Sequence, residues 1–314
     1  MRSQPPPGDG VSLEAERLLA WRRRLLRDGG SPAELDWLLD LAGGLGWRDL
    51  QHLHLDPART VRLRLTLAEL EELWWRHRRQ RIPLQYLVGR CPWRDLVLAV
   101  APGVLIPRQE TELLVDLALD RAARLPDSPG SPARLRHWAD LGTGSGAIAV
   151  ALARALPTWR GAAVDCEPAA LEQAGANIRR LTDPALVTLH CGRWWQPLRT
   201  LLGQLDLVVA NPPYIPSAEV ERLEPLVRDR EPRVALDGGP DGLTAIRDIA
   251  SGSGVALVPG GWLLLEHHHD QSAAVLELLR QAGLVDVTSA HDLEGRCRFA
   301  LARRPPSVGV QQDG

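Results

Sequence analysis

The feature that most constrains the fold of this chain is a regular alternation of strand and helix patterns that begins at Arg136. Strands are expected at a segment that ends with Asp165 and at residues 137–141, 186–191, 205–210 and 262–266, with two more near the C-terminus. Helices are expected between them, at residues 146–156, 168–181, 243–257 and 271–281. Because successive strand–helix units place their strands side by side, the pattern predicts an α/β fold with a doubly wound, mostly parallel sheet of seven strands.

The region before this alternation has a helical pattern. Apolar residues in the segment 13–25 recur near a period of about 3.6 residues, as on one face of a helix. Ser31-Pro32 is typical of a helix start, and Thr66 followed by Glu69 matches a capping box. Asp56-Pro57 is expected to open another short helical segment. We therefore predict a small helical N-terminal domain.

These patterns divide the chain into five parts. We expect a disordered N-terminus at 1–10, the helical domain at 11–85, a linker hairpin at 86–104, the α/β domain at 105–303 and a flexible tail at 304–314. The hairpin is indicated by Pro and Gly residues around the apolar run Leu96–Val100.

Composition excludes several classes of protein. The formal net charge of -2 over 314 residues provides no general basic field for nucleic acid. The first ten residues have no apolar core of a signal peptide, and no apolar run reaches the roughly 18 residues of a membrane helix. The four cysteines are widely spaced and are expected to be reduced thiols. We expect a cytoplasmic protein with no membrane association.

A glycine-rich turn follows the first strand of the α/β domain. Its sequence, Asp-Leu-Gly-Thr-Gly-Ser-Gly-Ala at residues 140–147, places glycine at 142, 144 and 146 between a strand and a helix. Glycine lets the backbone turn sharply and approach a ligand, and the helix start provides free N–H groups. A dinucleotide site has its third glycine one residue later, so the spacing favours S-adenosylmethionine. Gly142, Thr143, Gly144, Ser145 and Gly146 are the predicted contacts.

Two further residues are candidates for the same cofactor. Asp165 ends the second strand, where an acid can accept hydrogen bonds from both ribose hydroxyls, although a solvated loop Asp would look the same. Trp194 follows the third strand and could flank the adenine ring. In a chain with eleven Trp and one Phe, packing in the core is the alternative role for this indole.

The segment Asn211-Pro212-Pro213-Tyr214 directly follows the apolar fourth strand. Asn211 can offer a side-chain carbonyl and Pro212 a backbone carbonyl, which together would accept both N–H groups of a planar NH2 target. The prolines restrict the backbone, and Tyr214 can lie against the planar group and near a sulfonium. A rigid Pro-Pro turn without chemistry is the alternative. We predict that this segment holds the group that is methylated.

Two other clusters of residues are weaker candidates for a functional site. His267, His268 and His269 are adjacent in an extended segment, so their side chains alternate between faces, and we predict no metal site. The basic run at residues 76–81 is expected to be a solvated helix face, and binding of an acidic partner is the alternative.

The sequence resembles the bacterial release factor glutamine methyltransferases, also called the HemK or protein-(glutamine-N5) methyltransferase family. The resemblance is carried by residues 105–112 (Leu-Ile-Pro-Arg-Gln-Glu-Thr-Glu), 140–149, 211–215 (Asn-Pro-Pro-Tyr-Ile), 231–239, 241–243 and 260–267. It implies a class I methyltransferase sheet and a small helical N-terminal domain. One departure is Arg193, which stands where relatives often have an acid that could accept from the adenine amino group.

The resemblance also implies a reaction. It predicts transfer of a methyl group from S-adenosylmethionine to the glutamine N5 of the Gly-Gly-Gln motif in class I peptide chain release factors, with S-adenosylhomocysteine as product. Residues 142–146, Asp165, Trp194 and Asn211 would contact the cofactor. Asn211, Pro212, Pro213 and Tyr214 would hold the glutamine. The helical domain and hairpin would dock the release factor, and we expect a monomer.

Three other functions remain open at this point. A glutamine methyltransferase that acts on a ribosomal protein would share the same build. A DNA or RNA amino-methyltransferase would also need a holder for a planar NH2 group, but the net charge of -2 and the helical N-terminal region argue against it. A nucleotide-binding module without activity is disfavoured by the intact Asn211–Tyr214 segment.

Overall fold

The computed structural model of the protein describes residues 10–53, 55–125 and 134–306. The chain divides into two compact units, Met1–Arg90 and Cys91–Gly314. The unit boundary thus falls five residues beyond the expected end of the helical domain at residue 85. Nearly all of the N-terminus predicted to be disordered, the end of the predicted tail and the segment 126–133 lie outside the described residues.

The first unit is mainly helical. Its helices are α1 (Ala15–Arg27), α2 (Pro32–Leu41), α3 (Trp47–His52), α4 (Leu67–Gln80) and α5 (Leu84–Val88). Both predicted caps are present: Ser31 with Glu34, and Thr66 with Glu69, form capping boxes at the starts of α2 and α4. Each box satisfies backbone N–H groups that the first turn of a helix leaves without partners.

Two expectations for this unit were wrong. A two-stranded antiparallel sheet pairs β1 (Val11–Glu14) with β2 (Thr60–Leu63), where only helix was expected. Four residues are too few to distinguish a strand period from the helical pattern that continues into α1. The short third helix is α3, and Asp56 instead begins a turn, with its carbonyl accepting from Arg59 N at 3.2 Å. Asp-Pro starts turns as readily as helices.

The second unit contains a seven-stranded sheet and, except for its first residue Arg90, a two-stranded hairpin. The hairpin pairs β3 (Arg90–Trp93) with β4 (Leu96–Ala99). The sheet strands are β5 (His137–Leu141), β6 (Arg160–Asp165), β7 (Val187–Cys191), β8 (Leu205–Ala210), β9 (Leu257–Glu266), β10 (Val285–His291) and β11 (Cys297–Arg303). Their spatial order is β10-β11-β9-β8-β5-β6-β7. Strands β5 to β9 run parallel, and β11 is antiparallel to both neighbours.

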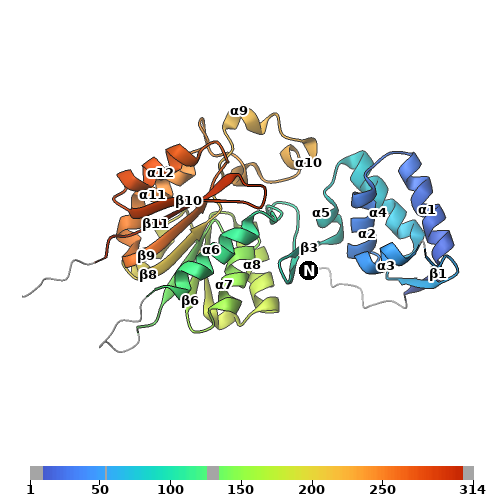
Figure 1. The fold of residues 1–314 in the computed structure, drawn as a ribbon, viewed down its shortest axis with the longest axis horizontal. Helices are drawn as coiled ribbons and strands as arrows, with labels where there is room; N and C mark the ends of the chain where they lie inside the picture. Colours follow the sequence, from blue (N-terminus) through green and yellow to red (C-terminus); the bar gives the residue numbers. More distant parts are fainter. Residues whose placement is uncertain (1–9, 54, 126–133, 307–314) are drawn as a thin grey trace, which may run out of the picture. The chain divides into compact units, whose positions relative to one another are not determined.

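Helices cover both faces of this sheet (Figure 1). On one face lie α6 (Thr111–Ala123), α7 (Ala147–Ala155) and α8 (Pro168–Leu181), and on the other lie α11 (Thr244–Ala256) and α12 (Ser272–Gln281). The remaining short elements are η1 (Pro184–Leu186), η2 (Gln196–Leu201), α9 (Ser217–Val220), α10 (Pro225–Arg228) and η3 (Arg233–Ala235). This arrangement confirms the predicted doubly wound, mostly parallel α/β fold.

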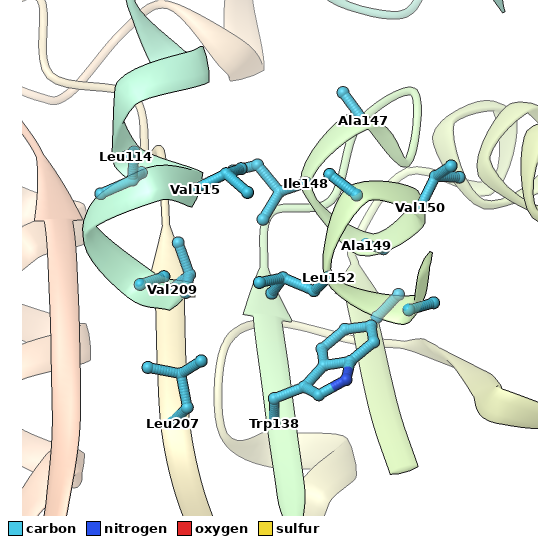
Figure 2. Close-up of a cluster of buried hydrophobic side chains, with 14 of the residues drawn as sticks. Leu114, Val115, Trp138, Ala147, Ile148, Ala149, Val150, Leu152, Leu207 and Val209 are labelled. Atoms are coloured by element: carbon cyan, nitrogen blue, oxygen red, sulfur yellow. The ribbon is translucent and has the colours of Figure 1, made fainter. Parts of the chain in front are cut away.

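Each face of the sheet has its own apolar core. Leu207 and Val209 of β8 pack against α6 and α7 together with Trp138 of β5, as Figure 2 shows. Val208 and Ala210 point to the opposite core with α11 and α12. All six residues of β8 are buried, as expected for a central parallel strand covered by helices on both sides. A central strand held in this way places the residue after it, Asn211, at a fixed point.

The strand order changes direction between β5 and β8, because the chain adds β6 and β7 on one side and β8 onward on the other. In open α/β sheets, ligands bind outside the carboxyl ends of strands at such a switch point. The glycine-rich turn follows β5, and Asn211 follows β8.

No helix of the described residues is both long enough and apolar enough to cross a membrane.

Candidate functional site

Two neighbouring cavities open at the carboxyl ends of the central parallel strands. The larger cavity, of about 440 Å³, is lined in part by residues that follow or end β5, β6, β7 and β8. The smaller cavity, of about 290 Å³, is lined mainly by the chain between residues 211 and 236. Leu105, Asn211 and Ala235 line both. Two ligands bound in these cavities would therefore meet at Asn211.

The glycine-rich turn forms part of the wall of the larger cavity. Gly142 and Gly144 line it and have φ of 80° and 54°, in the left-handed region that other residues rarely adopt. A Cβ built on Gly144 would meet no atom within 4 Å, so this position faces open space. Gly146 has another role: a Cβ there would lie 3.0 Å from Ala174 Cα, so it permits close packing of α7 on α8.

Thr143 and Ser145, which the sequence also predicted as cofactor contacts, are buried away from the cavity lining. The Thr143 hydroxyl donates to Asp140 Oδ2 at 2.7 Å. Burial raises the pKa of the Asp140 carboxyl to about 7, and this hydrogen bond opposes the rise. The Ser145 carbonyl accepts from Asn177 Nδ2 at 2.9 Å. These residues shape the turn from behind.

Asp165 lies at the end of β6 in the wall of the larger cavity. Its Oδ2 accepts from Gly144 N at 2.8 Å and its Oδ1 accepts from Glu167 N at 3.0 Å. Burial is the main cause that raises the pKa of this carboxyl, while hydrogen bonds from backbone N–H groups, including those of Glu167 and Gly144, lower it. A carboxylate has about four lone-pair sites, so two acceptor positions remain for a ligand.

Trp194 also lines the larger cavity, next to the glycine turn. A Cβ on Gly142 would lie 3.4 Å from Trp194 Cζ3. Trp194 has φ of 49°, a conformation that is strained for a bulky side chain and that is often found at functional sites. Arg193 lines the cavity as well, is half-exposed, and lies 3.5 Å from Asp248. Its guanidinium can only donate hydrogen bonds, so it provides no acceptor for an adenine amino group.

The four residues from Asn211 to Tyr214 separate the two cavities. Pro213 lines the larger cavity, Pro212 and Tyr214 line the smaller one, and Asn211 lines both. The Tyr214 hydroxyl donates to Glu266 Oε1 at 3.2 Å. Burial is the main cause that raises the pKa of Tyr214, and the Glu266 charge adds to it. The tyrosine is therefore neutral over the physiological range of pH.

Sequence reasoning missed two buried residues that contact this segment from behind. Asn211 Nδ2 donates to Thr111 Oγ1 at 2.9 Å, and Thr111 Oγ1 donates to Glu266 Oε2 at 2.7 Å. Glu266 is almost fully buried at the end of β9, and burial raises the pKa of its carboxyl to about 7 against opposing hydrogen bonds from Thr111 and Tyr214. A carboxyl at the end of an otherwise apolar strand was the sequence signal that could have found it.

A second ion pair borders the smaller cavity. Arg108 Nη2 lies 2.7 Å from Glu231 Oε1, and Glu231 Oε2 accepts from Ile106 N at 3.2 Å. Glu231 is buried while Arg108 is about one-third exposed and lines the cavity. The guanidinium thus keeps donors available toward this cavity.

Residues near the two ends of the segment 217–239 line the larger cavity. Ile215 and Asp237 form a parallel bridge, and the Ser217 hydroxyl donates to Asp237 Oδ1 at 2.6 Å. This hydrogen bond is the main cause that lowers the pKa of Asp237. Arg233 also donates to Asp237, at 3.1 Å.

The three consecutive histidines differ in burial, although the centroids of the His268 and His269 rings lie 4.2 Å apart. His267 is buried, with Nδ1 2.8 Å from the His268 carbonyl, whereas His269 is exposed. Within the described residues, no group of three or more His, Cys, Asp and Glu side chains is arranged to hold a metal ion.

The larger cavity fits S-adenosylmethionine in its donor and acceptor set. It offers a carboxylate for the ribose hydroxyls at Asp165, an indole at Trp194 and glycine backbone at Gly144 that faces open space. Its volume of about 440 Å³ is within the usual range for small-molecule sites of about 300–1,000 Å³.

Comparison with known proteins identifies similar sequences over almost the whole chain. A model of the family "Methyltransferase small domain" matches residues 119–228. The release factor glutamine methyltransferase of Prochlorococcus marinus is 51% identical over 93% of this chain and 98% of its own length. The protein of the same name from Synechocystis is 42% identical over 93% of this chain and 97% of its own, and that from Geobacter sulfurreducens is 39% identical over 91% and 95%.

Among solved structures, the hMettl16 catalytic domain in complex with MAT2A 3′UTR hairpin 1 aligns with a TM-score of 0.51 and 16% identity, over 88% of this chain and 93% of that one. At this identity the likeness concerns the fold alone.

Proposed function

The chain belongs to the release factor glutamine methyltransferases, which are S-adenosylmethionine-dependent enzymes, and we propose which atom it methylates and which residues do so. The proposed reaction is transfer of a methyl group from S-adenosylmethionine to the side-chain nitrogen N5 of the glutamine in the Gly-Gly-Gln motif of class I peptide chain release factors. S-adenosylhomocysteine is the second product.

One observation carries this proposal: Asn211 lines both cavities, and its amide nitrogen is already engaged from behind by Thr111. The Asn211 Oδ1 atom is therefore the end of the amide that remains for a ligand. An acceptor at the meeting point of a cofactor cavity and a second cavity suits a target that brings an N–H group to the methyl donor.

The chemical demand on the site is orientation. An amide nitrogen is a weak nucleophile because its lone pair is delocalised into the carbonyl group. In the proposal, Asn211 Oδ1 accepts one N–H of the target and the Pro212 carbonyl oxygen accepts the other, so the NH2 plane faces the larger cavity. Such positioning converts an encounter between two molecules into a step within one complex, which lowers the barrier by several kcal/mol (roughly 7–11 in favourable systems).

In the proposal, the larger cavity holds the cofactor through four residues. Asp165 accepts from the ribose hydroxyls, Trp194 lies against the adenine, and the backbone at Gly142 and Gly144 approaches the methionine portion. When bound, S-adenosylmethionine supplies the electrophilic methyl group. Gly142 lies close to Asn211, since a Cβ built on Gly142 would be 4.0 Å from the backbone carbonyl oxygen of Asn211. This closeness supports a position of the methyl group near Asn211.

The smaller cavity supports a protein side chain as the target. Its other walls are apolar residues of the segment 215–236 together with Arg108, whose donors can bind peptide carbonyl groups. Burial of the uncharged stem of glutamine against such walls is favourable. A ribosomal-protein glutamine would satisfy the same walls, so the experiment below includes it.

For the first unit we propose a role in docking the release factor. Helix α4 carries the basic run predicted from the sequence, in which the Arg79 guanidinium lies 4.3 Å from the centroid of the Trp75 ring. Arg76 and Arg79 are exposed and could contact an acidic surface of the partner. A substrate that works in translation would place the reaction in the cytoplasm. We also propose that the enzyme acts as a monomer.

The substrate class can be tested by incubating the enzyme with labelled S-adenosylmethionine and one of four acceptors: a class I release factor, the same factor with the Gly-Gly-Gln glutamine changed to Ala, a mixture of ribosomal proteins, or DNA. The proposal predicts label on the intact release factor and none on its Ala variant. Label only on ribosomal proteins would mean that a ribosomal protein, and not a release factor, is the substrate. Label only on DNA would overturn the proposal.

A further inference from the structure

Two buried side chains behind Asn211 decide which end of its amide faces the cavities. Thr111 is the first residue of α6 and Glu266 is the last residue of β9, and they are 5% and 1% exposed. Neither lines the larger or the smaller cavity. They join Asn211 through a hydrogen-bonded chain in which Asn211 Nδ2 lies 2.9 Å from Thr111 Oγ1 and Thr111 Oγ1 lies 2.7 Å from Glu266 Oε2.

The direction of these hydrogen bonds follows from the number of protons. A threonine hydroxyl has one proton, and an ionised carboxylate can only accept. With Glu266 ionised, the Thr111 proton is donated to Glu266, and the hydroxyl can then only accept from Asn211. The Asn211 amide must present its NH2 end to Thr111, and its carbonyl oxygen consequently points the other way, to the place where the target nitrogen is proposed to bind.

We propose that Thr111 and Glu266 are positioning residues that lock the Asn211 amide with its oxygen toward the target, an inference that rests on the proposed function of Asn211 as an acceptor. Tyr214 supports the lock, because its hydroxyl donates to the second carboxylate oxygen of Glu266 at 3.2 Å. Both oxygens of Glu266 are therefore held by donors from two different segments. The same count of protons also allows a second state, in which the hydrogen bonds of this chain run in the opposite direction.

Protonation of Glu266 reverses the chain. A protonated carboxyl can donate to Thr111 Oγ1, and the hydroxyl then directs its own proton at Asn211. The Asn211 amide must turn over to accept it, which presents NH2 to a target that also offers N–H groups. Two donors facing each other cannot hydrogen-bond, so the target is no longer held.

The charges around Glu266 determine where this reversal occurs. Arg298 on β11 and the Thr111 and Tyr214 hydroxyls favour the ionised form, and Glu110 before α6 opposes it. Burial outweighs them and raises the pKa of Glu266 to about 7. Since the ionised form is required, activity should fall as the pH decreases below this value.

The test compares Thr111→Val with Thr111→Ser. Valine keeps the shape and removes the hydroxyl, whereas serine keeps the hydroxyl and removes one methyl group. We expect Thr111→Val to lower kcat for a Gly-Gly-Gln release factor by about 100-fold, the usual loss for one misplaced hydrogen-bonding group in an active site. Thr111→Ser should stay within about threefold of the wild type, and S-adenosylhomocysteine affinity by calorimetry should change by less than about threefold in both, since cofactor contacts are intact.

The pH profile provides the readout that a purely structural role would not move. The decline in kcat at low pH should persist in Thr111→Ser and disappear in Thr111→Val, where Glu266 no longer communicates with Asn211. If thermal melting shows that Thr111→Val is unfolded, Thr111→Ala carries the same comparison with less crowding against the carboxylate.

The outcomes separate this inference from the proposed function. A wild-type enzyme that methylates no glutamine would refute the proposed function. Two results with an active wild type would refute the lock and leave the proposed function standing. One is that Thr111→Val retains more than about one-third of the wild-type kcat. The other is that Thr111→Ser is as impaired as Thr111→Val.

Discussion

Replacement of Asp165 by Ala is the sharpest test of the proposed cofactor cavity. The carboxylate accepts from Gly144 N at 2.8 Å and from Glu167 N at 3.0 Å, which leaves two acceptor positions toward the cavity. If each position accepts one ribose hydroxyl, the substitution removes two hydrogen bonds to a charged group.

The magnitude follows from these two bonds. A hydrogen bond to a charged group contributes about 1.5–3 kcal/mol, so the loss is about 3–6 kcal/mol. At about 1.4 kcal/mol for each tenfold change, the Kd of S-adenosylhomocysteine should rise by roughly 100-fold to 10,000-fold. The lower part of this range is more realistic, because water can enter the space and rebind the hydroxyls.

The assay is isothermal titration of S-adenosylhomocysteine into the wild type, Asp165→Ala and a matched control, Asp183→Ala. Asp183 also caps a backbone N–H, accepting from Ala185 N at 2.9 Å, but it is exposed and does not line the larger cavity. The control should keep the wild-type Kd. If the Kd of the Asp165→Ala enzyme stays within about threefold of the wild type, Asp165 does not bind the ribose and the reasoning is refuted.

Three further outcomes are expected. Asn211→Ala should lower kcat by about 100-fold or more with a melting temperature within a few degrees of the wild type, since it removes the target acceptor and no core packing; near-normal turnover would exclude it as the acceptor. Arg193→Asp should tighten S-adenosylhomocysteine binding about fivefold in titration, because an added acceptor for the adenine amino group contributes about 1 kcal/mol. The half-exposed ion pair with Asp248 that is lost contributes little. Weaker binding would mean that adenine does not lie near residue 193. Glu266→Gln should change the pH dependence of unfolding. Burial raises the pKa of Glu266 from its ordinary value of 4.5 to about 7 in the folded protein, so the stability that this group contributes is fully present below pH 4.5 and is lost as the pH rises through about 7. In urea titrations, the fall in unfolding free energy from pH 5 to pH 8 should shrink by about 2.5 kcal/mol in Glu266→Gln; an unchanged fall would mean that Glu266 does not titrate there.

The α/β unit was predictable because local signals and the final fold agree there. The strands at 137–141 and 205–210 and the helix at 168–181 have the predicted bounds. An all-buried central strand is a continuous apolar run, and Pro168 marks the first residue of its helix. The first unit was harder, because β1 and β2 have only four residues each and are defined by their pairing. No local pattern in the sequence encodes that pairing.

The site divides in the same way. Residues that contact a ligand through a local motif, such as Gly142, Gly144 and Asn211, could be proposed from spacing alone, and all three line the larger cavity. The Thr111–Glu266 chain could not, because it joins residues separated by 155 positions, and Thr111 meets Asn211 across 100 positions. Gly146 shows the converse: it belongs to the motif, but the structure uses it to pack α7 on α8.

The identity of the methylated atom tests the central claim most directly. A class I release factor treated with the enzyme and S-adenosylmethionine can be digested, and the peptide that contains Gly-Gly-Gln can be fragmented in a mass spectrometer, with synthetic N5-methylglutamine peptide as the standard. The account predicts one methyl group on the glutamine side-chain nitrogen and none when Asn211 is replaced by Ala. A methyl group on any other residue of the factor, or equal methylation by the Asn211→Ala enzyme, would contradict it.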